Sequence, residues 1–192
     1  VGPYGAYLAD GSEYRGDYGK TREELADFHR ERIHILAEAG PDVFACETIP
    51  CLVEALAETD VLSEIPGAEA WISFSCKDGL HTCGGDLISD CAKALKDIKE
   101  VAAIGINCTA PQYVESLIKE IVKVTDKPVV VYPNSGEDYD AGSKSWEGSA
   151  AKYEDYVKIW YEAGARLIGG CCRTGPEDIR KVAAFRKSLI EK

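Results

Sequence analysis

Two adjacent cysteines, Cys171 and Cys172, end an apolar run and stand just before a predicted helix. A third cysteine, Cys108, ends another apolar run earlier in the chain. Thiolates are soft ligands that suit Zn²⁺, and three of them leave one of its four tetrahedral positions open, as in a catalytic zinc site. Two other interpretations of the adjacent pair remain open from the residues alone: a strained vicinal disulfide, or two small residues that only pack.

The other cysteines and the histidines give weaker signals. Five cysteines lie at strand ends, in loops or inside a predicted helix, where packing is the simplest role: Cys46, Cys51, Cys76, Cys83 and Cys91. Cys51 and Cys83 share predicted loops with His81, so a second metal site there is a minor alternative. His29 and His34 are five residues apart, which is the wrong spacing for one helix face, and we expect ordinary surface or packing roles for both.

Glu47 is the carboxylate whose position is most suggestive. It directly follows the apolar run DVFAC, so we expect it near the same end of the fold as the thiols. The alternative is an acidic residue at a helix N-terminus, where it would interact favourably with the helix dipole. The segment from Pro133 to Trp146 is long for a connection between a strand and a helix, which is typical of a lid or a binding loop.

Short apolar runs alternate with amphipathic segments along the chain. The runs are apolar throughout, as expected for parallel strands buried on both faces. The predicted strands are Asp42–Cys46, Ala70–Cys76, Ala103–Cys108, Pro128–Tyr132 and Arg166–Cys171, with Val1–Ala6 as the rest of an earlier one. Capping boxes are predicted at Thr21 with Glu24 and at Thr174 with Glu177.

About six such βα units fit either an open doubly wound sheet or a (β/α)₈ barrel. The glycine-rich phosphate turn of the open fold is absent, and the chemically interesting residues lie at strand ends, which form the catalytic face of a barrel. A barrel typically needs about 250 residues, so this chain of 192 falls two strands short. We therefore predict an N-terminally truncated (β/α)₈ barrel of class α/β, with residues 1–192 as a single partial domain. The lack of any methionine, even at position 1, also suggests part of a longer protein.

Composition narrows the partners. The net charge of −11 argues against a nucleic acid partner, because binding to phosphates requires a basic surface. No run approaches the roughly 18 apolar residues of a membrane span, and the first residues do not resemble a signal peptide. Eight cysteines without a secretory signal suggest reduced thiols. We therefore expect a cytoplasmic protein that acts on small molecules.

Five stretches of the sequence resemble the homocysteine S-methyltransferases: VGPYGAYLADGSEYRGDY, FACETIP, IGINC, VVVYPNSGE and GARLIGGCCRT. They occur in the same order as in that family and extend over essentially the whole chain. The bacterial and plant members that use S-methylmethionine look nearest, and the combination of IGINC with GGCC is a specific signature. The resemblance implies a barrel that catalyses zinc-dependent methyl transfer to the thiol of L-homocysteine, forming methionine.

The resemblance implies three zinc ligands, which are Cys108 from the IGINC motif and Cys171 and Cys172 from GGCC. Zinc would hold the homocysteine sulfur in its fourth position and keep it ionised, although a free thiol has a pKa of about 8.5. The methyl group of a sulfonium donor is already activated, so no general base is needed at the transfer step. The protein would chiefly align the reacting atoms.

The resemblance also implies substrate-binding residues. Glu47 would help to bind the amino group of homocysteine, and Asn107 would support the site beside its neighbouring zinc ligand. Glu13 and Tyr14, in the GSEYRG stretch, would line the substrate site.

One departure from the family is large. Its members begin with a strand that ends in an Asp-Gly motif and a second strand near a Thr/Ser-x-Tyr element, and this chain contains neither. We therefore expect an incomplete pocket and poor activity from these residues alone. Methylcobalamin, betaine or S-adenosylmethionine remain alternative donors. A non-catalytic zinc protein, or a redox protein that cycles a Cys171–Cys172 disulfide, is an alternative of another class.

Overall fold

The computed structural model describes residues 1–140, 145–148, 150 and 153–191. A parallel five-stranded sheet forms its centre, with the strand order β1-β2-β3-β4-β7. The strands are β1 (Phe44–Ile49), β2 (Ala70–Phe74), β3 (Val101–Asn107), β4 (Val129–Tyr132) and β7 (Ala165–Ile168). This arrangement confirms the predicted α/β class built from successive βα units.

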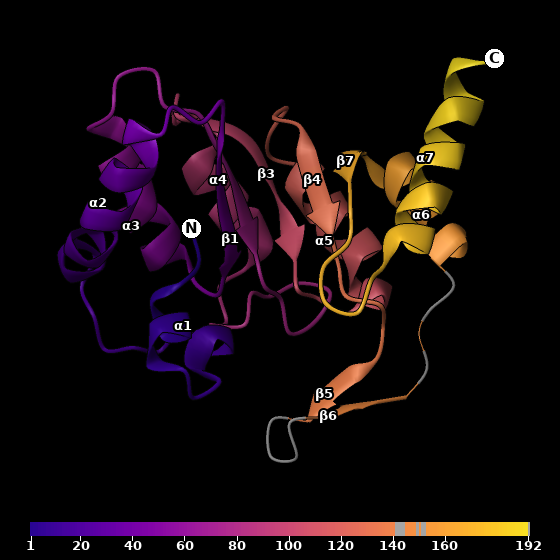
Figure 1. The fold of residues 1–192 in the computed structure, drawn as a ribbon, viewed down its shortest axis with the longest axis horizontal. Coiled ribbons are helices and arrows are strands. Elements are labelled where there is room, and N and C mark those ends of the chain that lie inside the picture. The colour runs from indigo at the N-terminus through magenta and orange to yellow at the C-terminus, as the bar shows by residue number, and fades with distance from the viewer. Residues whose placement is uncertain (141–144, 149, 151–152, 192) are drawn as a thin grey trace.

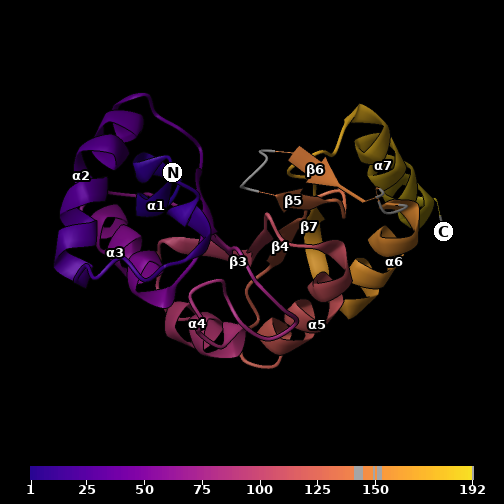
Figure 2. The same cartoon turned by 90° about the horizontal axis from the view of Figure 1, so that it is seen from below.

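Helices cover one side of the sheet. Figure 2 shows them as an outer arc around the curved sheet, which leaves the concave side of the sheet facing inward. The longer helices are α2 (Arg22–Glu38), α3 (Leu52–Ser63), α4 (Ile88–Leu95), α5 (Pro111–Val122), α6 (Tyr153–Ala163) and α7 (Pro176–Ile190). One helical layer outside a curved parallel sheet is the arrangement of a (β/α) barrel rather than of a doubly wound sheet.

Four short elements lie at one end of the sheet. They are the helix α1 (Tyr4–Leu8), the 3₁₀ turn η1 (Ser12–Tyr14) and the antiparallel pair β5 (Asp138–Asp140) and β6 (Ser145–Glu147). Figure 1 shows the strand arrows pointing toward the end where α1 and the β5–β6 pair lie. The predicted loop from Pro133 to Trp146 thus contains most of a short hairpin, and its residues 141–144 lie outside the described residues.

The apolar residues of strands and helices meet between the sheet and the helical layer. Helical spacing predicts one apolar face of α5 from Val114, Leu117, Ile118, Ile121 and Val122; the first four are fully buried, but Val122, the last residue of the helix, is exposed. Pro111 begins this helix, where its missing N–H costs nothing. Gly105 of β3 is required by close packing, because a Cβ atom there would lie 1.7 Å from the backbone oxygen of Val130 on β4.

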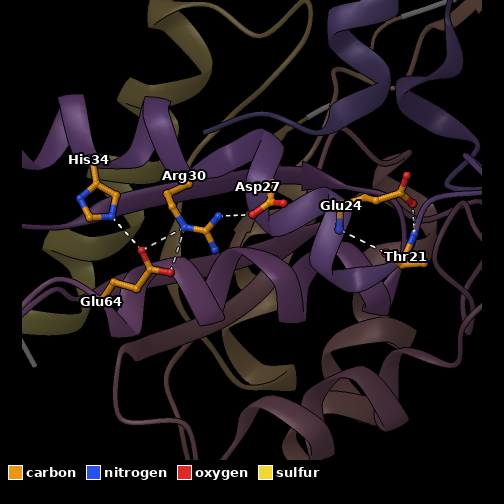
Figure 3. A network of polar contacts seen from close by, with 6 residues as sticks. All are labelled: Thr21, Glu24, Asp27, Arg30, His34 and Glu64. Carbon is orange, nitrogen blue, oxygen red and sulfur yellow. Dashed lines mark hydrogen bonds and ion pairs between the residues drawn. The ribbon is translucent and has the colours of Figure 1, made fainter.

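Helices α2 and α3 pack on each other and are joined at the surface by charged groups. The predicted capping box is confirmed, since Thr21 and Glu24 each bind the backbone N–H of the other at 3.2 and 2.8 Å. Figure 3 shows that Glu64, just after α3, accepts hydrogen bonds from Arg30 and lies 2.9 Å from His34, both on α2. Arg30 also binds Asp27 one turn earlier.

The predicted strand over Val1–Ala6 is wrong, and the sheet therefore has five strands rather than six. Pro3 has no N–H to donate to a neighbouring strand, and it instead precedes the first turn of α1. Only Val1 pairs with the sheet: its N-terminal amine donates to the carbonyl of Ala45 at 2.5 Å, and its carbonyl accepts from the N–H of Glu47 at 2.9 Å.

The predicted capping box at Thr174 is also wrong. Helix α7 begins at Pro176, so Gly175 is the capping residue, and its N–H donates to the Asp178 carboxylate at 3.0 Å. Thr174 instead donates its hydroxyl proton to the carbonyl of Cys171 at 2.7 Å. The Thr174 side chain therefore stabilises the turn that contains the cysteine pair rather than the N-terminus of α7. Among the described residues, no helix combines the length and the apolar character needed to cross a membrane.

Candidate metal centre and adjoining pocket

Three thiols meet at the carboxyl ends of β3 and β7. The Sγ atom of Cys108 lies 2.8 Å from that of Cys171 and 3.8 Å from that of Cys172, and the adjacent pair is 4.0 Å apart. All three are free thiols, whereas a vicinal disulfide needs an S–S distance of about 2.05 Å. In the described part of the chain, no other trio of His, Cys, Asp or Glu side chains brings its ligand atoms within 4.8 Å of one another.

The spacing of the thiols can be compared with that around a tetrahedral ion. Zn–S bonds of about 2.3 Å give S···S edges of about 3.8 Å in a tetrahedron. The separations of 3.8 and 4.0 Å at Cys172 are close to this value. Cys108 and Cys171 would have to move apart by about 1 Å to share the ion. The donor set fits a soft divalent metal ion with one open coordination position.

Unusual backbone conformations surround the thiols. Cys108, Thr48 and Arg173 all have left-handed φ angles, of 46°, 65° and 65°, although none is glycine. Such residues cost about 1–3 kcal/mol each and persist only where the surrounding structure holds them, which is common at functional sites. Thr48 lies at an irregularity near the end of β1, Cys108 directly follows β3, and Arg173 directly follows the cysteine pair, so the strain is concentrated at the end of the sheet that carries the thiols.

The double glycine before the cysteine pair provides room. Neither Gly169 nor Gly170 has a left-handed φ angle, so conformational freedom is not what the turn requires. A Cβ atom on Gly170 would lie 2.3 Å from the hydroxyl of Thr174, the residue that binds the carbonyl of Cys171. The absent side chain thus allows Thr174 to fold back over the turn.

The three thiols influence one another's protonation. Hydrogen bonds from Cys108 and then Cys172 lower the pKa of Cys171 to about 3. The hydrogen bonds of Cys108 with Cys171 and Cys172, followed by burial, raise the pKa of Cys108 far above its usual range. The pKa of Cys172 is raised because the lowering effect of its hydrogen bond with Cys108 is outweighed by its contact with Cys171 and by burial. The contacts thus favour the ionised form of Cys171 and disfavour ionisation of Cys108 and Cys172, whereas a bound cation would favour ionisation of all three.

Tyr14 lies beside this cluster, at the end of η1. Burial raises the pKa of its hydroxyl, and the neighbouring Cys108 and Cys172 raise it further. The phenol thus stays protonated and can donate a hydrogen bond toward sulfur. Glu13, the preceding residue, is half-buried and contributes its charge to the surroundings of Tyr14, but no contact joins it to the thiols.

Asn107 connects the thiol cluster to β1. Its amide oxygen accepts the N–H of Thr48 at 2.7 Å and the hydroxyl of Ser73 at 2.9 Å, and its amide nitrogen donates to the hydroxyl of Thr48 at 2.8 Å. The side chain is buried, and its oxygen is fully used within the protein. Asn107 therefore holds the left-handed turn after Glu47 while its own backbone leads into Cys108.

Glu47 lies inside β1 rather than after it, because the strand continues to Ile49. The alternative role at a helix N-terminus is therefore wrong, since α3 begins only at Leu52. Glu47 faces a cavity of about 380 Å³ on the concave side of the sheet, which Trp71 and Tyr132 also line. The cavity extends to the two glycines before Cys171, which brings the carboxylate and the thiols to one continuous region.

Two aromatic side chains in this cavity were not predicted as site residues. The indole N–H of Trp71 donates to the hydroxyl of Tyr132 at 3.0 Å, and that hydroxyl also hydrogen-bonds with Ser73. Burial raises the pKa of Tyr132, and the Glu47 charge contributes in the same direction. A signal was available, because Trp71 and Ser73 alternate with Ile72 and Phe74 along one strand and so share its other face.

The remaining cysteines lie apart from this region. Cys46 faces the helical layer beside Glu58 of α3 rather than the interior of the barrel. Burial raises the pKa of Cys51 to about 12 and also raises those of the other four: Cys46, Cys76, Cys83 and Cys91. These thiols stay protonated. The imidazole of His81 is engaged with Asp78 at 3.0 Å, and no metal cluster forms with Cys51 and Cys83 among the described side chains.

A sequence profile described as "Homocysteine S-methyltransferase" matches residues 1–185. The chain belongs to the homocysteine S-methyltransferase family. It is 56% identical over 191 residues to homocysteine S-methyltransferase YbgG of Bacillus subtilis, covering 98% of this chain and 61% of that protein. It is 51% identical over 202 residues to homocysteine S-methyltransferase 2 of Arabidopsis thaliana, covering 100% of this chain and 59% of the relative.

The structural comparison leads to the same family. A crystal structure of the homocysteine methyltransferase MmuM from Escherichia coli, in its metallated form, matches with a TM-score of 0.84 and 43% identity. The match covers 96% of this chain and 59% of that one. The chain thus spans about three-fifths of the length of the family members that it matches. Their shared α/β architecture agrees with the curved, partial sheet.

Proposed function

We propose that this chain provides the metal centre and much of the homocysteine pocket of a zinc-dependent homocysteine S-methyltransferase. The reaction transfers a methyl group from a sulfonium donor to the thiol of L-homocysteine and yields methionine. S-methylmethionine is the favoured donor, with S-adenosylmethionine second. The observation that carries the proposal is the meeting of Cys108, Cys171 and Cys172, whose sulfur atoms lie 2.8 to 4.0 Å apart at the strand ends. Free thiols are compatible with a reducing compartment, and we propose the cytoplasm.

The three cysteines are the proposed zinc ligands. Their sulfur atoms form a soft donor set, and two of the three separations are near the tetrahedral edge of about 3.8 Å. Family membership supports this assignment, since the matched MmuM structure is a metallated form. Bound Zn²⁺ would accept the homocysteine sulfur in its open position and lower the pKa of that thiol from about 8.5, so that it is ionised at neutral pH.

The protein's own residues would bind and orient the substrates. Glu47 would pair with the ammonium group of homocysteine in the cavity on the concave side. Asn107 would hold Glu47 and Cys108 in place relative to each other, because its side chain bonds to Thr48, the residue after Glu47, and its backbone leads into Cys108. The protonated hydroxyl of Tyr14 would donate toward sulfur, and Glu13 would line the mouth of the site. These roles chiefly supply orientation, which can account for several kcal/mol of a reaction barrier.

The transfer step itself is a displacement at carbon. The thiol proton leaves to solvent before the step, and the sulfur electron pair of homocysteine then forms a bond to the methyl carbon. The bond between that carbon and the donor sulfonium breaks, and its electrons neutralise the donor sulfur. With S-methylmethionine both products are methionine. No protein group has to accept a proton during the transfer.

Barrel closure would require further strands. The observed sheet ends at β1 and β7, and Val1 already pairs with the outer edge of β1. Helix α7 has no buried residue and exposes Ile179 and Ile190, which is an apolar face suited to packing against a neighbour. We propose that the part of the relatives not matched by this chain supplies strands between β7 and β1. We expect low activity without them.

The test measures zinc content and methionine formation together. This chain, and a version extended by the N-terminal segment of the Bacillus subtilis relative, would be assayed with homocysteine and each donor: S-methylmethionine, S-adenosylmethionine, betaine and methylcobalamin. We expect about one zinc per chain and activity with a sulfonium donor in the extended version. Cys108→Ala should abolish both, whereas Cys83→Ala, which removes a half-buried thiol outside the cluster, should change neither.

Three results would contradict the proposal. Full activity of the extended Cys108→Ala variant would exclude the three-thiolate site. Activity only with betaine or methylcobalamin would overturn the sulfonium donor. A metal-free chain in which Cys171 and Cys172 form a reducible disulfide would favour the redox alternative.

A further inference from the structure

A short strap follows β4 and touches both halves of the thiol cluster. The strap is residues 133–137, with the sequence PNSGE. The N–H of Asn134 donates at 3.0 Å to the carbonyl of Thr109, the residue after Cys108. The N–H of Ser135 donates at 3.0 Å to the carbonyl of Cys172. The carbonyl of Pro133 accepts a hydrogen bond from the N–H of Cys171 at 2.9 Å. The strap thus links the β3 side of the cluster to the β7 side through backbone bonds.

The last residue of the strap forms an ion pair with the residue after the cysteines. Nε and Nη2 of Arg173 donate to the two carboxylate oxygens of Glu137 at 3.1 and 3.2 Å. The carboxylate also accepts the hydroxyl of Ser135 at 2.9 Å and is only 15% exposed, while the Arg173 side chain is 52% exposed. A two-bond Arg–carboxylate contact fixes both distance and orientation, unlike a single surface ion pair.

We propose that the Glu137–Arg173 pair is a latch that positions Cys171 and Cys172 for metal binding. Arg173 has a left-handed φ angle of 65°, which is unfavourable for an arginine and must be held by its surroundings. The guanidinium is anchored on the strap, and the strap is anchored on the carbonyl of Cys172. Releasing the guanidinium lets this turn relax and moves the sulfur of the adjacent cysteine.

Both latch residues act through the cysteine turn and are positioning residues. Groups that orient metal ligands without touching the metal typically change its affinity 10- to 100-fold when they are removed. The inference rests on the proposed metal centre, because a latch on the cysteine pair has this consequence only if the pair binds a metal. It adds two residues, Glu137 and Arg173, and the strap between them to the site.

The experiment measures Zn²⁺ affinity by competition with a chromophoric chelator. Arg173→Lys keeps the charge but loses the two-bond geometry, and Glu137→Gln keeps the shape but loses the charge. We expect each variant to bind Zn²⁺ about tenfold more weakly. The matched control is the pair Arg22–Asp60, which also makes two bonds, both 2.6 Å, between α2 and α3. Arg22→Lys and Asp60→Asn should stay within twofold of the unchanged chain.

A second readout separates positioning from general loosening. In the metal-free protein, the rate of alkylation of each thiol can be followed by peptide mass spectrometry. The latch variants should alter the rates at Cys171 and Cys172 by about threefold or more and leave Cys83 unchanged. A merely structural role would change all the partly buried thiols together and lower the unfolding temperature.

The outcomes are distinguishable. Zinc affinity within twofold of the unchanged chain in both latch variants, or an equal loss in the control pair, overturns the latch. If Cys108→Ala also binds zinc as tightly as the unchanged chain, the metal centre itself is wrong; if Cys108→Ala loses zinc, only the latch fails. Should the chain alone prove unstable, the same variants are measured in the version extended by the Bacillus subtilis segment.

Discussion

The thiol cluster at the strand ends differs from a second polar cluster in the helical layer. Cys108, Cys171 and Cys172 are all partly exposed, lie beside two cavities and are surrounded by strained turns and hydrogen bonds. Such a site is accessible to a ligand, and its neighbours fix the orientation of its donor atoms. The cost of its strained backbone is consistent with selection for binding rather than for stability.

The second cluster lies between α2, α3 and β1 and is closed. His29, Glu54 and Glu58 have no exposed surface. The Glu54 carboxylate accepts hydrogen bonds from Nε2 of His29 at 2.9 Å and from the backbone N–H of Tyr4 at 2.5 Å. Among the described residues, Nδ1 of His29, one oxygen of Glu54 and both oxygens of Glu58 have no partner at hydrogen-bond distance, although Nδ1 of His29 lies 3.7 Å from one Glu58 oxygen. The cluster is therefore a buried polar set whose main consequence is for stability.

The difference shows that burial and titratable side chains do not by themselves make a site. The closed cluster contains the kinds of side chain that bind metals, yet its ligand atoms do not converge. The open cluster has fewer charges but converging donors with an access route. Substitutions in the closed cluster should change the free energy of unfolding and leave the affinity for zinc unchanged. Substitutions in the open cluster should change the affinity for zinc and have little effect on the free energy of unfolding.

The largest expected effect is in the closed cluster. Glu54→Ala leaves the imidazole of His29 and the N–H of Tyr4 without their acceptor inside the protein. We expect the free energy of unfolding to fall by about 3–5 kcal/mol, the usual cost of breaking a buried polar pair. Urea unfolding followed by circular dichroism measures it. Zinc stoichiometry of the folded fraction should be unchanged.

Glu31→Ala, which removes an exposed carboxylate from α2, is the matched control and should change stability little. A loss below about 1 kcal/mol for Glu54→Ala would mean that the buried cluster relaxes or admits water, and would weaken the distinction between the two clusters.

The thiol cluster could be predicted from the sequence, whereas the buried cluster of His29, Glu54 and Glu58 could not. The thiols were predictable because each ends a β-branched, apolar strand, and parallel strands bring their carboxyl ends to one edge. His29 was placed among ordinary surface or packing residues, since helical spacing shows which face it occupies but not which partners face it. Glu54 and Glu58 look like ordinary acidic residues of an amphipathic helix, and only the packing of α2 on α3 reveals their burial.

Local chemistry also limited the prediction of boundaries. Glu47 appeared to follow its strand, because its charge interrupts an apolar run, yet the strand continues to Ile49 with Glu47 facing the cavity. Arg173 and Glu137 are far apart in sequence, and their pairing depends on a loop path that no periodicity encodes. The family resemblance supplied the proposed roles of Cys108 and Glu47 in chemistry, which the residue types alone left open.

A substitution at Asn107 should lower both the free energy of unfolding and the affinity for zinc. Replacement by Ala removes hydrogen bonds to Thr48 and Ser73 and leaves the partly buried N–H of Thr48 without its acceptor. We expect a loss of about 2 kcal/mol in unfolding free energy and about tenfold weaker zinc binding through the displaced Cys108. Both can be measured on one sample, by urea unfolding and by chelator competition.

Ser73→Ala provides the control: it removes one hydrogen bond to Asn107 and the one with Tyr132 but keeps the two bonds between Asn107 and Thr48, with an expected loss of about 1–2 kcal/mol and no change in zinc affinity. If Asn107→Ala alters stability alone, Asn107 does not couple β1 to the metal centre.

Glu58 offers a smaller effect with a defined pH dependence. Burial raises its pKa well above the usual 4.5, and the charge of Glu54 adds to this, while Cys46, the amine of Val1 and Arg32 lower it. A carboxyl whose pKa is higher in the folded state stabilises folding below about pH 4.5 and loses that contribution as the pH rises through the folded value. Glu58→Gln should remove this decline and stabilise the protein by about 1 kcal/mol at pH 8.

Unfolding free energies at pH 4, 6 and 8 would reveal the effect as a difference between variant and parent that grows with pH. A difference that is constant with pH, or a destabilisation at pH 8, would show that Glu58 is ionised in the folded state and bonded in a way that this structure does not contain.

The smallest expected effect concerns the surface network in Figure 3. Glu64 binds Arg30 at 3.1 Å and His34 at 2.9 Å, but its side chain is 36% exposed and screened by water. Hydrogen bonds from His34 and Arg30 lower its pKa, so its contribution is present above the usual carboxyl range and is lost as the pH falls through the lowered value. Glu64→Gln should shift the unfolding temperature by less than about 2 °C at pH 7. A shift as large as that of Glu54→Ala would contradict the view that burial, rather than the number of polar contacts, separates the two carboxylates that bind α2.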